Sequence, residues 1–311
     1  MAPRTGDVLH ELTLEAAECL GLSFDEAADR VARSGEEFRA EWERLVRDPR
    51  DADAVVRFYS ESAFELFEQI AWHATEPIHH RSLVCADLAA TRPGRELLDY
   101  GSGIGSNAIV FGLAGFRVTL ADVADPLLRF ARWRCERRGL AVRTIDLKRE
   151  PPERGRYDVV TCFDVLEHVP DPIEAVRRMR DALRPGGVLF LYAPFGPDPE
   201  RPQHIVHEDP VTPRIRSLGF DRLAEWEERF PFHVRAPACY VRVTRSAAAG
   251  AAYYVRDRWL NGPVGDAVAR LWRRLAGGAR RTAATGATER SGPPPPKAGA
   301  AAEARGARGN R

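Results

Sequence analysis

One stretch, Glu96–Asn107, constrains the fold of this chain more than any other. An apolar strand ends at Asp99, and three glycines follow at alternate positions, Gly101, Gly103 and Gly105. Glycine lets the backbone bend sharply and lie against a ligand without Cβ atoms in the way. The amides that begin the next helix then face that ligand. The stretch therefore predicts a strand–loop–helix unit that binds a nucleotide-like cofactor.

A second strand follows and ends in Asp122, about twenty residues beyond the glycines. An acid at that distance is the expected partner for ribose hydroxyls in a Rossmann-type site. The spacing is Asp-x-Gly-x-Gly-x-Gly, not Gly-x-Gly-x-x-Gly, and the difference matters. Asp99, ahead of the first glycine, would repel a pyrophosphate but would help to hold a ligand that carries an amino group.

Strand-like and helix-like segments alternate from residue 95 onward, which is typical of a parallel sheet covered by helices. Together they predict an α/β fold. We expect strands at 96–99, 117–122, 142–145, 157–163 and 187–193, helices at 107–114, 126–138 and 172–183, and a closing antiparallel pair within 220–226 and 234–244.

The segments on either side of this core differ from it. Residues before 90 read as helical: Ser23 and Glu26 have capping-box spacing, one face carries Phe38, Trp42 and Leu45, and a second helix is predicted over 52–70. We divide the chain into a helical cap or lid (1–90), a cofactor domain (91–246), an amphipathic helical segment (247–276) and a disordered Ala/Gly/Pro/Arg-rich tail (277–311). The first region either covers the site or simply packs on the core. The basic tail either contacts an anionic surface or extends into solvent.

Two further motifs lie downstream. Residues 163–170 read Phe-Asp-Val-Leu-Glu-His-Val-Pro, and residues 183–189 read Leu-Arg-Pro-Gly-Gly-Val-Leu. With the glycine loop and Asp122, they occur in the order found in the class I S-adenosylmethionine (SAM) dependent methyltransferases, which the chain resembles over residues 95–245. The resemblance implies a Rossmann-like, seven-stranded, mostly parallel sheet with helices on both faces. It also implies SAM as cofactor and a small-molecule acceptor, with O-methylation slightly preferred over N- or C-methylation.

The resemblance assigns the ends of four strands to the cofactor. Asp99 and the glycines would lie under the methionine half, Asp122 would bind the ribose, and Asp146 would bind the adenine amino group. For each acid alone, a helix cap or turn is the simpler explanation. The predicted cofactor-binding residues are Asp99, Gly101, Gly103, Gly105, Asp122, Val123, Asp146, Leu147 and Asp164.

Three histidines are candidates for the chemistry. His168 follows the fourth strand, where the resemblance places the reactive methyl, and imidazole is well matched to taking a proton from a hydroxyl. A purely structural role for His168 stays open. His204 and His207 are three residues apart, with Glu208 beside them, and would share one face of a helical turn. They suit acceptor binding, a second base or a metal, unless they only belong to a capped turn.

A metal is the second option for the loop after the fourth strand. Some quinone-pathway O-methyltransferases hold a divalent ion on a Glu-x-x-Glu-His cluster, and here Asp164, Glu167 and His168 occupy the matching positions. Oxygen-rich ligation would suit magnesium or manganese. Asp at the first position shortens the reach of that ligand. We therefore expect SAM without a metal ion.

Composition limits the alternatives. The formal net charge is +1 over 311 residues, which gives no argument for a nucleic-acid partner. The five cysteines are scattered, the first residues lack a secretory apolar core, and no run is long enough to span a membrane. We expect a cytoplasmic protein. Two other functions stay open: an NAD(P)-dependent oxidoreductase on a similar sheet, and a SAM-binding protein without turnover.

Overall fold

The computed structural model describes residues 5–75, 78–207 and 211–260. The chain separates into two units, Met1–Arg258 and Trp259–Arg311, and the sheet and the candidate site belong to the first. The predictions for the basic tail, for most of the amphipathic segment and for Glu208 lie outside the described residues.

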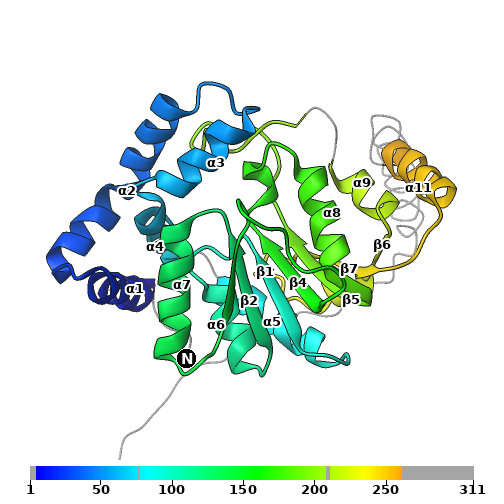
Figure 1. The fold of residues 1–311 in the computed structure, drawn as a ribbon, viewed down its shortest axis with the longest axis horizontal. Coiled ribbons are helices and arrows are strands. Elements are labelled where there is room, and N and C mark those ends of the chain that lie inside the picture. Colours follow the sequence, from blue (N-terminus) through cyan, green and yellow to red (C-terminus); the bar gives the residue numbers. More distant parts are fainter. Residues whose placement is uncertain (1–4, 76–77, 208–210, 261–311) are drawn as a thin grey trace, which may run out of the picture. The chain divides into compact units, whose positions relative to one another are not determined.

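A seven-stranded sheet forms the centre of the first unit, in the strand order β3-β2-β1-β4-β5-β7-β6 (Figure 1). Neighbouring strands from β3 to β5 run parallel, and β7 is antiparallel to both β5 and β6. The predicted fold class is therefore confirmed. The strands are β1 (Glu96–Tyr100), β2 (Arg117–Asp122), β3 (Arg143–Asp146), β4 (Tyr157–Phe163), β5 (Leu183–Tyr192), β6 (Phe220–Arg222) and β7 (Ala238–Arg242).

Helices precede, connect and follow these strands. The predicted strand over 220–226 is wrong beyond Arg222, because a short helix begins two residues later. The helices are α1 (Thr5–Leu20), α2 (Phe24–Leu45), α3 (Ala52–Glu61), α4 (Glu65–Thr75), α5 (Ile78–Ala90), α6 (Ser106–Leu113), α7 (Asp125–Arg137), α8 (Pro172–Ala182), α9 (Val211–Ser217), α10 (Ala224–Glu227) and α11 (Ala247–Leu260), with a 3-10 turn η1 (Leu166–His168).

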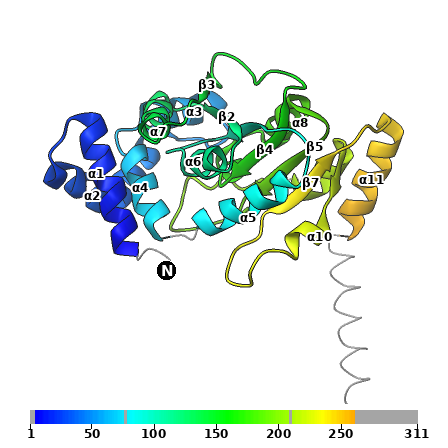
Figure 2. The same cartoon turned by 90° about the horizontal axis from the view of Figure 1, so that it is seen from below.

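Adjacent residues of the central strand β1 serve opposite faces of the sheet, as strand geometry requires. Leu97 packs in a buried cluster with side chains of α5, α6 and α7, whereas Leu98 packs in another with side chains of α8 and α9. Both leucines are fully buried. Helices thus cover both faces (Figure 2). The strand order reverses between β1 and β4, so the carboxyl ends of these strands border one crevice.

The N-terminal helices α1–α4 pack together next to α7 (Figure 1). The predicted capping box is confirmed, since the Glu26 amide donates to Ser23 Oγ at 3.2 Å and the Ser23 amide donates to Glu26 Oε2 at 2.8 Å. On α2, which contains all three residues of the predicted face, Phe38 and Trp42 are buried, whereas Leu45 at the end of the helix is exposed.

The single helix predicted over 52–70 is also wrong, because the chain breaks at Ser62. The Ser62 hydroxyl accepts from the amides of Phe64 and Glu65, at 3.2 Å each, and so starts the new helix α4. Serine competes with the helical backbone in this way and favours helix starts over helix interiors. The break separates α3 from α4, and both helices border the candidate site.

A buried ion pair joins α1 to α7 beneath the glycine loop. Arg134 Nε donates to Glu15 Oε2 at 2.7 Å, and both side chains are more than nine-tenths buried. The guanidinium also donates to the Ile104 carbonyl at 2.6 Å and to Ser106 Oγ at 3.2 Å. Because a buried charge is costly unless it is paired and hydrogen-bonded, this network fixes the N-terminal helix to the loop.

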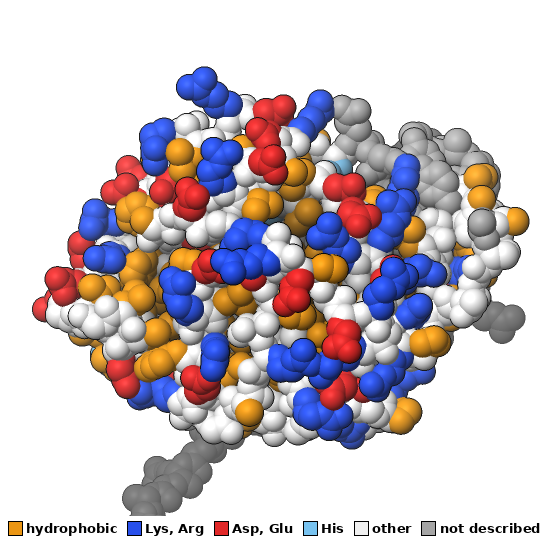
Figure 3. Space-filling model, viewed as in Figure 1, with side chains coloured by type: hydrophobic (Ala, Val, Ile, Leu, Met, Phe, Trp, Pro, Cys, Tyr) orange, Lys and Arg blue, Asp and Glu red, His pale blue; other side chains and the backbone are white. Residues whose placement is uncertain are grey.

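The surface drawn in Figure 3 carries both signs of charge. Lys and Arg side chains are interspersed there with Asp and Glu side chains. Of the helices in the described ranges, none combines the length and apolar character that crossing a membrane requires.

Candidate active site

A cavity of about 300 Å³ lies where β1, β2 and β4 end, a size typical of small-molecule sites. Most of its lining comes from two sets of elements. The first set, which we call the loop end, follows β1, β2 and β3: Tyr100, Gly101, Ser102, Gly103, Asp122, Val123, Leu147 and Lys148. The second, the helical end, includes residues of α2, α3, α4, η1 and the loop after β5: Phe38, Val55, Val56, Tyr59, Glu65, Glu68, Gln69, Trp72, Glu167, His168, Arg201, Gln203 and His204.

Asp122 organises the loop end. Its Oδ2 accepts from the Gly103 amide at 2.9 Å, and its Oδ1 accepts from the Ala124 amide at 3.0 Å. Burial raises the pKa of Asp122, while these amides act in the opposite direction. The carboxylate thus joins the end of β2 to the glycine loop and borders the cavity.

A close contact with α4, which the sequence did not reveal, also requires glycine at position 103. Its φ is +50°, and a Cβ there would lie 2.3 Å from Gln69 Oε1 on α4. Gln69 Oε1 accepts from the Ile104 amide at 3.1 Å, and Gln69 Nε2 donates to Glu65 Oε1 at 2.8 Å. The N-terminal helices therefore touch the glycine loop directly.

The predicted cofactor-binding residues separate into two groups. Those that line the cavity are Gly101, Gly103, Asp122, Val123, Leu147 and Asp164; Asp99, Gly105 and Asp146 are not part of its lining. Asp99 lies beneath the loop, where its Oδ1 accepts from Thr161 Oγ1 at 2.7 Å and burial raises its pKa to about 7. Asp146 pairs at 3.3 Å with Lys148, which does line the cavity.

Asp164, which is partly buried, forms an ion pair with the buried Arg81 of α5, at 3.3 Å. The guanidinium also lies over the rings of Phe163 and Tyr192, at 5.0 and 4.3 Å from their centres. Among the described non-glycine residues, Asp164 alone has a positive φ, +56°. Such conformations cost energy and concentrate at functional sites. This one carries the chain from β4 into η1.

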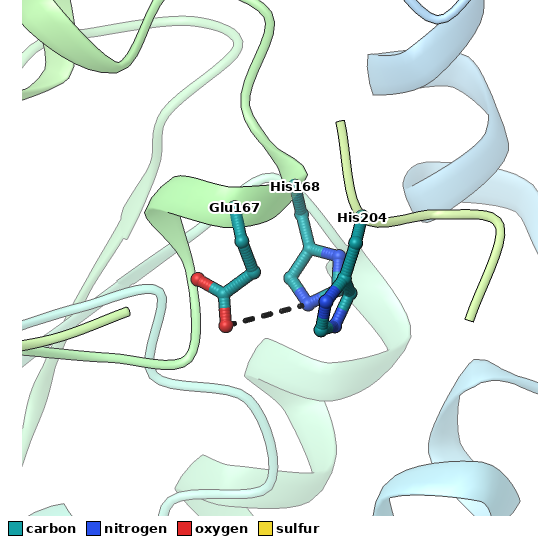
Figure 4. A group of neighbouring side chains, drawn as sticks. All are labelled: Glu167, His168 and His204. Carbon is teal, nitrogen blue, oxygen red and sulfur yellow. Dashed lines mark ion pairs between the residues drawn. The ribbon is translucent and has the colours of Figure 1, made fainter. Parts of the chain in front are cut away.

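Glu167, His168 and His204 converge at the helical end (Figure 4). Glu167 Oε1 is 3.9 Å from His168 Nε2, and the two imidazole rings are 4.9 Å apart, edge to face. The loop after β5 is fixed to η1 by its backbone, because the Ile205 amide donates to the Glu167 carbonyl at 2.7 Å. Residues distant in sequence are thereby held in one cluster.

Burial governs the protonation of this cluster. It raises the pKa of Glu167 to about 8, with the nearby charge of Asp164 adding to the effect. It lowers the pKa of His168 to about 3, with His204 as the second cause, and it also lowers the pKa of His204. His168 Nδ1 is 3.2 Å from the Gln203 carbonyl. Since a carbonyl only accepts, Nδ1 carries the proton and Nε2 presents its lone pair to Glu167.

The three predicted catalytic histidines do not come together. Residues 201–207 form a loop without helix, so the prediction that His204 and His207 share a helical face is wrong. His204 lines the cavity with His168. The ring of His207 instead lies against Phe195, with ring centres 5.8 Å apart, and is not part of the cavity lining. Its catalytic role stays a prediction.

The set of side chains that could bind a metal ion also differs from the predicted one. Glu167, His168 and His204 form the one set of three metal-ligating side chains, within the part of the chain that the structure describes, whose ligand atoms all lie within 4.8 Å of one another. Asp164, the first position of the predicted motif, pairs with Arg81 instead. The quinone-pathway arrangement of donors therefore does not fit this chain, and a set with a histidine from another segment takes its place.

Three residues of the N-terminal helices at the helical end, Tyr59, Glu65 and Glu68, were not predicted as site residues. Tyr59 has its ring 5.9 Å from that of His168, edge to face. Glu65 and Glu68 of α4 line the cavity, and burial raises the pKa of both carboxyl groups. One signal was available in the sequence: these acids are interspersed with apolar residues such as Phe67 and Ile70. Carboxyl groups whose pKa is raised by burial in a cleft are candidates for a functional site.

Comparison with known proteins identifies the family. The sequence profile described as a methyltransferase domain matches residues 77–235, just over half of the chain. The chain belongs to the methyltransferase-domain family. This confirms the resemblance to the class I SAM-dependent methyltransferases.

Relatives of this methyltransferase domain include two ubiquinone biosynthesis O-methyltransferases. The protein from Xanthomonas campestris pv. campestris (strain B100) is 37% identical over 124 residues, 37% of this chain and 51% of its own length. That from Bordetella avium is 36% identical over 122 residues, 38% of this chain and 50% of its own length. The chain thus spans about half the length of these relatives. Among solved structures, the 1,6-didemethyltoxoflavin-N1-methyltransferase of Burkholderia thailandensis matches with a TM-score of 0.47 and 20% identity, over 64% of this chain and 92% of that chain.

Proposed function

We propose that this protein transfers a methyl group from SAM to a small-molecule acceptor, with oxygen as the preferred methylated atom. The observation that carries the proposal is one cavity bordered by both the glycine loop and the Glu167–His168–His204 cluster. SAM would occupy the loop end, with its ribose on Asp122 and its adenine near Leu147. The acceptor would occupy the helical end.

Methyl transfer from SAM requires little covalent chemistry from the protein itself. SAM arrives activated: the acceptor oxygen attacks the methyl carbon, the carbon–sulfur bond breaks, S-adenosylhomocysteine leaves, and the acceptor hydroxyl loses its proton. The protein contributes orientation and exclusion of water. The aromatic side chains of Phe38, Tyr59 and Trp72 border the cavity and suit a flat ring. They come from α2, α3 and α4, which supports the prediction that the N-terminal helices cap the site.

Oxygen is preferred for two reasons. The two ubiquinone-biosynthesis relatives are O-methyltransferases by name. The cluster also offers a hydroxyl group a hydrogen-bond acceptor, since Nε2 of His168 is the ring nitrogen left with a lone pair. Burial holds the pKa of this ring at about 3, so His168 orients the hydroxyl group and does not store its proton. His168 and His204 thus remain our candidates for activation of the acceptor. Cytoplasmic location and the lack of a nucleic-acid partner stay predictions.

Transfer of labelled methyl from SAM to a panel of phenols, catechols and aromatic amines tests this function. We expect transfer to at least one hydroxyl acceptor, and His204→Ala should reduce turnover while the affinity for S-adenosylhomocysteine stays unchanged. His207→Ala, whose ring lies outside the cavity lining, should have the smaller effect. Tight binding of S-adenosylhomocysteine without transfer to any acceptor would favour the SAM-binding protein without turnover.

A further inference from the structure

We propose that Glu167, His168 and His204 bind a divalent first-row transition-metal ion of the zinc type at the helical end of the cavity. This donor set is not the one that the resemblance implied, because Asp164 is absent from it and the loop after β5 supplies a histidine. It also departs from the metal-free expectation drawn from the sequence. The role of the ion toward the acceptor rests on the proposed function, but its binding does not.

The first argument is electrostatic. Glu167 is 1% exposed, and neither of its carboxylate oxygens has a hydrogen-bond partner among the described residues. Its Oε1 faces His168 Nε2 at 3.9 Å, and Nε2 carries a lone pair because Nδ1 donates to the Gln203 carbonyl. The Glu167 carboxyl group and the lone pair of His168 Nε2 thus face each other in a buried place, too far apart for a hydrogen bond. A cation between them would be bound by both groups and would satisfy the buried carboxyl oxygens.

The second argument is geometric. The donor atoms of all three side chains lie within 4.8 Å of one another (Figure 4). Ligand atoms about 2.1 Å from a tetrahedral zinc ion lie about 3.4 Å apart, so small side-chain rotations bring the three donors onto one ion. The hydrogen bond from His168 Nδ1 to a backbone carbonyl is the usual outer-shell support of a metal-bound histidine.

The donor types select the class of ion. Magnesium and calcium prefer ligand sets made of oxygen alone, whereas imidazole suits zinc, copper, iron and nickel. Two histidines and one carboxylate leave open positions on the ion, as catalytic sites require. Arg201 lines the same cavity and opposes a cation, yet its side chain is 41% exposed and its Nε lies 3.9 Å from Asp198. An ion held here would face the acceptor and lower the pKa of a hydroxyl bound to it.

Direct binding of metal tests the proposal. Untagged protein would be treated with a chelator, freed of the chelator and titrated with Co²⁺, and visible absorption would report binding. Zn²⁺ would then be added to displace the Co²⁺, and Mg²⁺ would be added to a parallel sample for comparison. We expect one Co²⁺ per chain, displaced by Zn²⁺ and not by equal Mg²⁺. Loss of an outer-shell partner alone costs about 10–100-fold in affinity, so His204→Ala and Glu167→Gln should each weaken binding by about 100-fold or more.

A matched control is available in the same loop. His207→Ala removes a histidine three residues from His204 but outside the cluster, and should leave the Co²⁺ affinity unchanged. Wild-type protein that binds neither Co²⁺ nor Zn²⁺, or a His204→Ala variant with wild-type affinity, would overturn the proposal. The affinity of the same samples for S-adenosylhomocysteine separates this outcome from failure of the proposed function, since the loop end binds it without the cluster.

Discussion

The two ends of the cavity are built in different ways. The loop end comes from one continuous run of sequence, residues 100–148, in which each strand end supplies lining residues in turn. The helical end combines α2, α3 and α4 with η1 and with the loop that holds His204, segments far apart in the chain. The same fold thus carries one end that follows from local order and another that exists only after the chain has folded.

The two ends of the cavity also differ in how their buried polar groups are hydrogen-bonded. At the loop end the carboxylate that lines the cavity is satisfied from within, since Asp122 accepts from the amides of Gly103 and Ala124. Within this set Ser102 Oγ is the one buried side-chain polar atom that lacks a partner among the described residues. The helical end holds groups such as Tyr59 Oη and both oxygens of Glu167 that lack partners among the described residues. A preformed loop suits a constant cofactor, whereas unpaired buried groups call for a ligand. Variants at each end of the cavity test this difference.

The largest effect is expected at the ion pair under the loop end. Glu15→Ala would leave the charge of Arg134 buried and unpaired, and breaking such a pair costs about 3–5 kcal/mol. We expect that loss in the free energy of unfolding measured with urea. The matched control is Glu18→Ala, which breaks the pair with Arg137 that lies half exposed on the same two helices. It should cost less than about 1 kcal/mol. Equal losses would mean that the buried pair does not hold the loop.

Asp122→Ala should come next, and it should affect the loop end alone. Hydrogen bonds to a charged group contribute about 1.5–3 kcal/mol, which corresponds to a loss of about 10–100-fold in affinity for S-adenosylhomocysteine by calorimetry. The Co²⁺ affinity of the helical end should not change. Asp87→Ala, at an exposed position of α5, is the control. Loss of both affinities in Asp122→Ala would show that the two ends are not independent.

Gly103→Ala examines the contact where the two ends meet. Alanine at position 103 would keep the positive φ of the glycine, which costs about 1–2 kcal/mol. Its Cβ would also collide with Gln69 Oε1. In the double variant Gly103→Ala/Gln69→Ala, part of the free energy of unfolding that Gly103→Ala loses should be recovered, because the collision is gone. Strictly additive losses would contradict the contact between α4 and the loop.

The last prediction concerns a gradual change of stability with pH. Burial raises the pKa of Asp99 from 3.8 to about 7, so between these values the folded protein keeps a proton that the unfolded chain has lost. Stability should therefore fall as pH rises from about 4 to 7, by at most about 1.4 kcal/mol per pH unit. Asp99→Asn, which can still accept from Thr161, should flatten this slope in urea unfolding. An unchanged slope would assign the pH dependence to other groups.

The sequence predicted the sheet and the loop end well because both depend on short-range order. Strand alternation and the glycines at 101 and 103 determine local geometry, and four of the five parallel strands were placed within about one residue. Ser62 shows the limit, since one hydroxyl divided a helix that its apolar spacing had predicted as continuous. At the helical end His168 was found from its motif. Its contact with His204, and the position of His207 outside the lining, depend on how a loop packs on η1, which no local pattern specifies.

The most direct test of the central claim is a calorimetric titration of the purified protein with S-adenosylhomocysteine, with NADH as the control. Micromolar binding of S-adenosylhomocysteine, lost in Asp122→Ala, and no heat with NADH are the predicted results. Clear heat with NADH and none with S-adenosylhomocysteine would contradict the assignment of the loop end to SAM and favour the oxidoreductase instead.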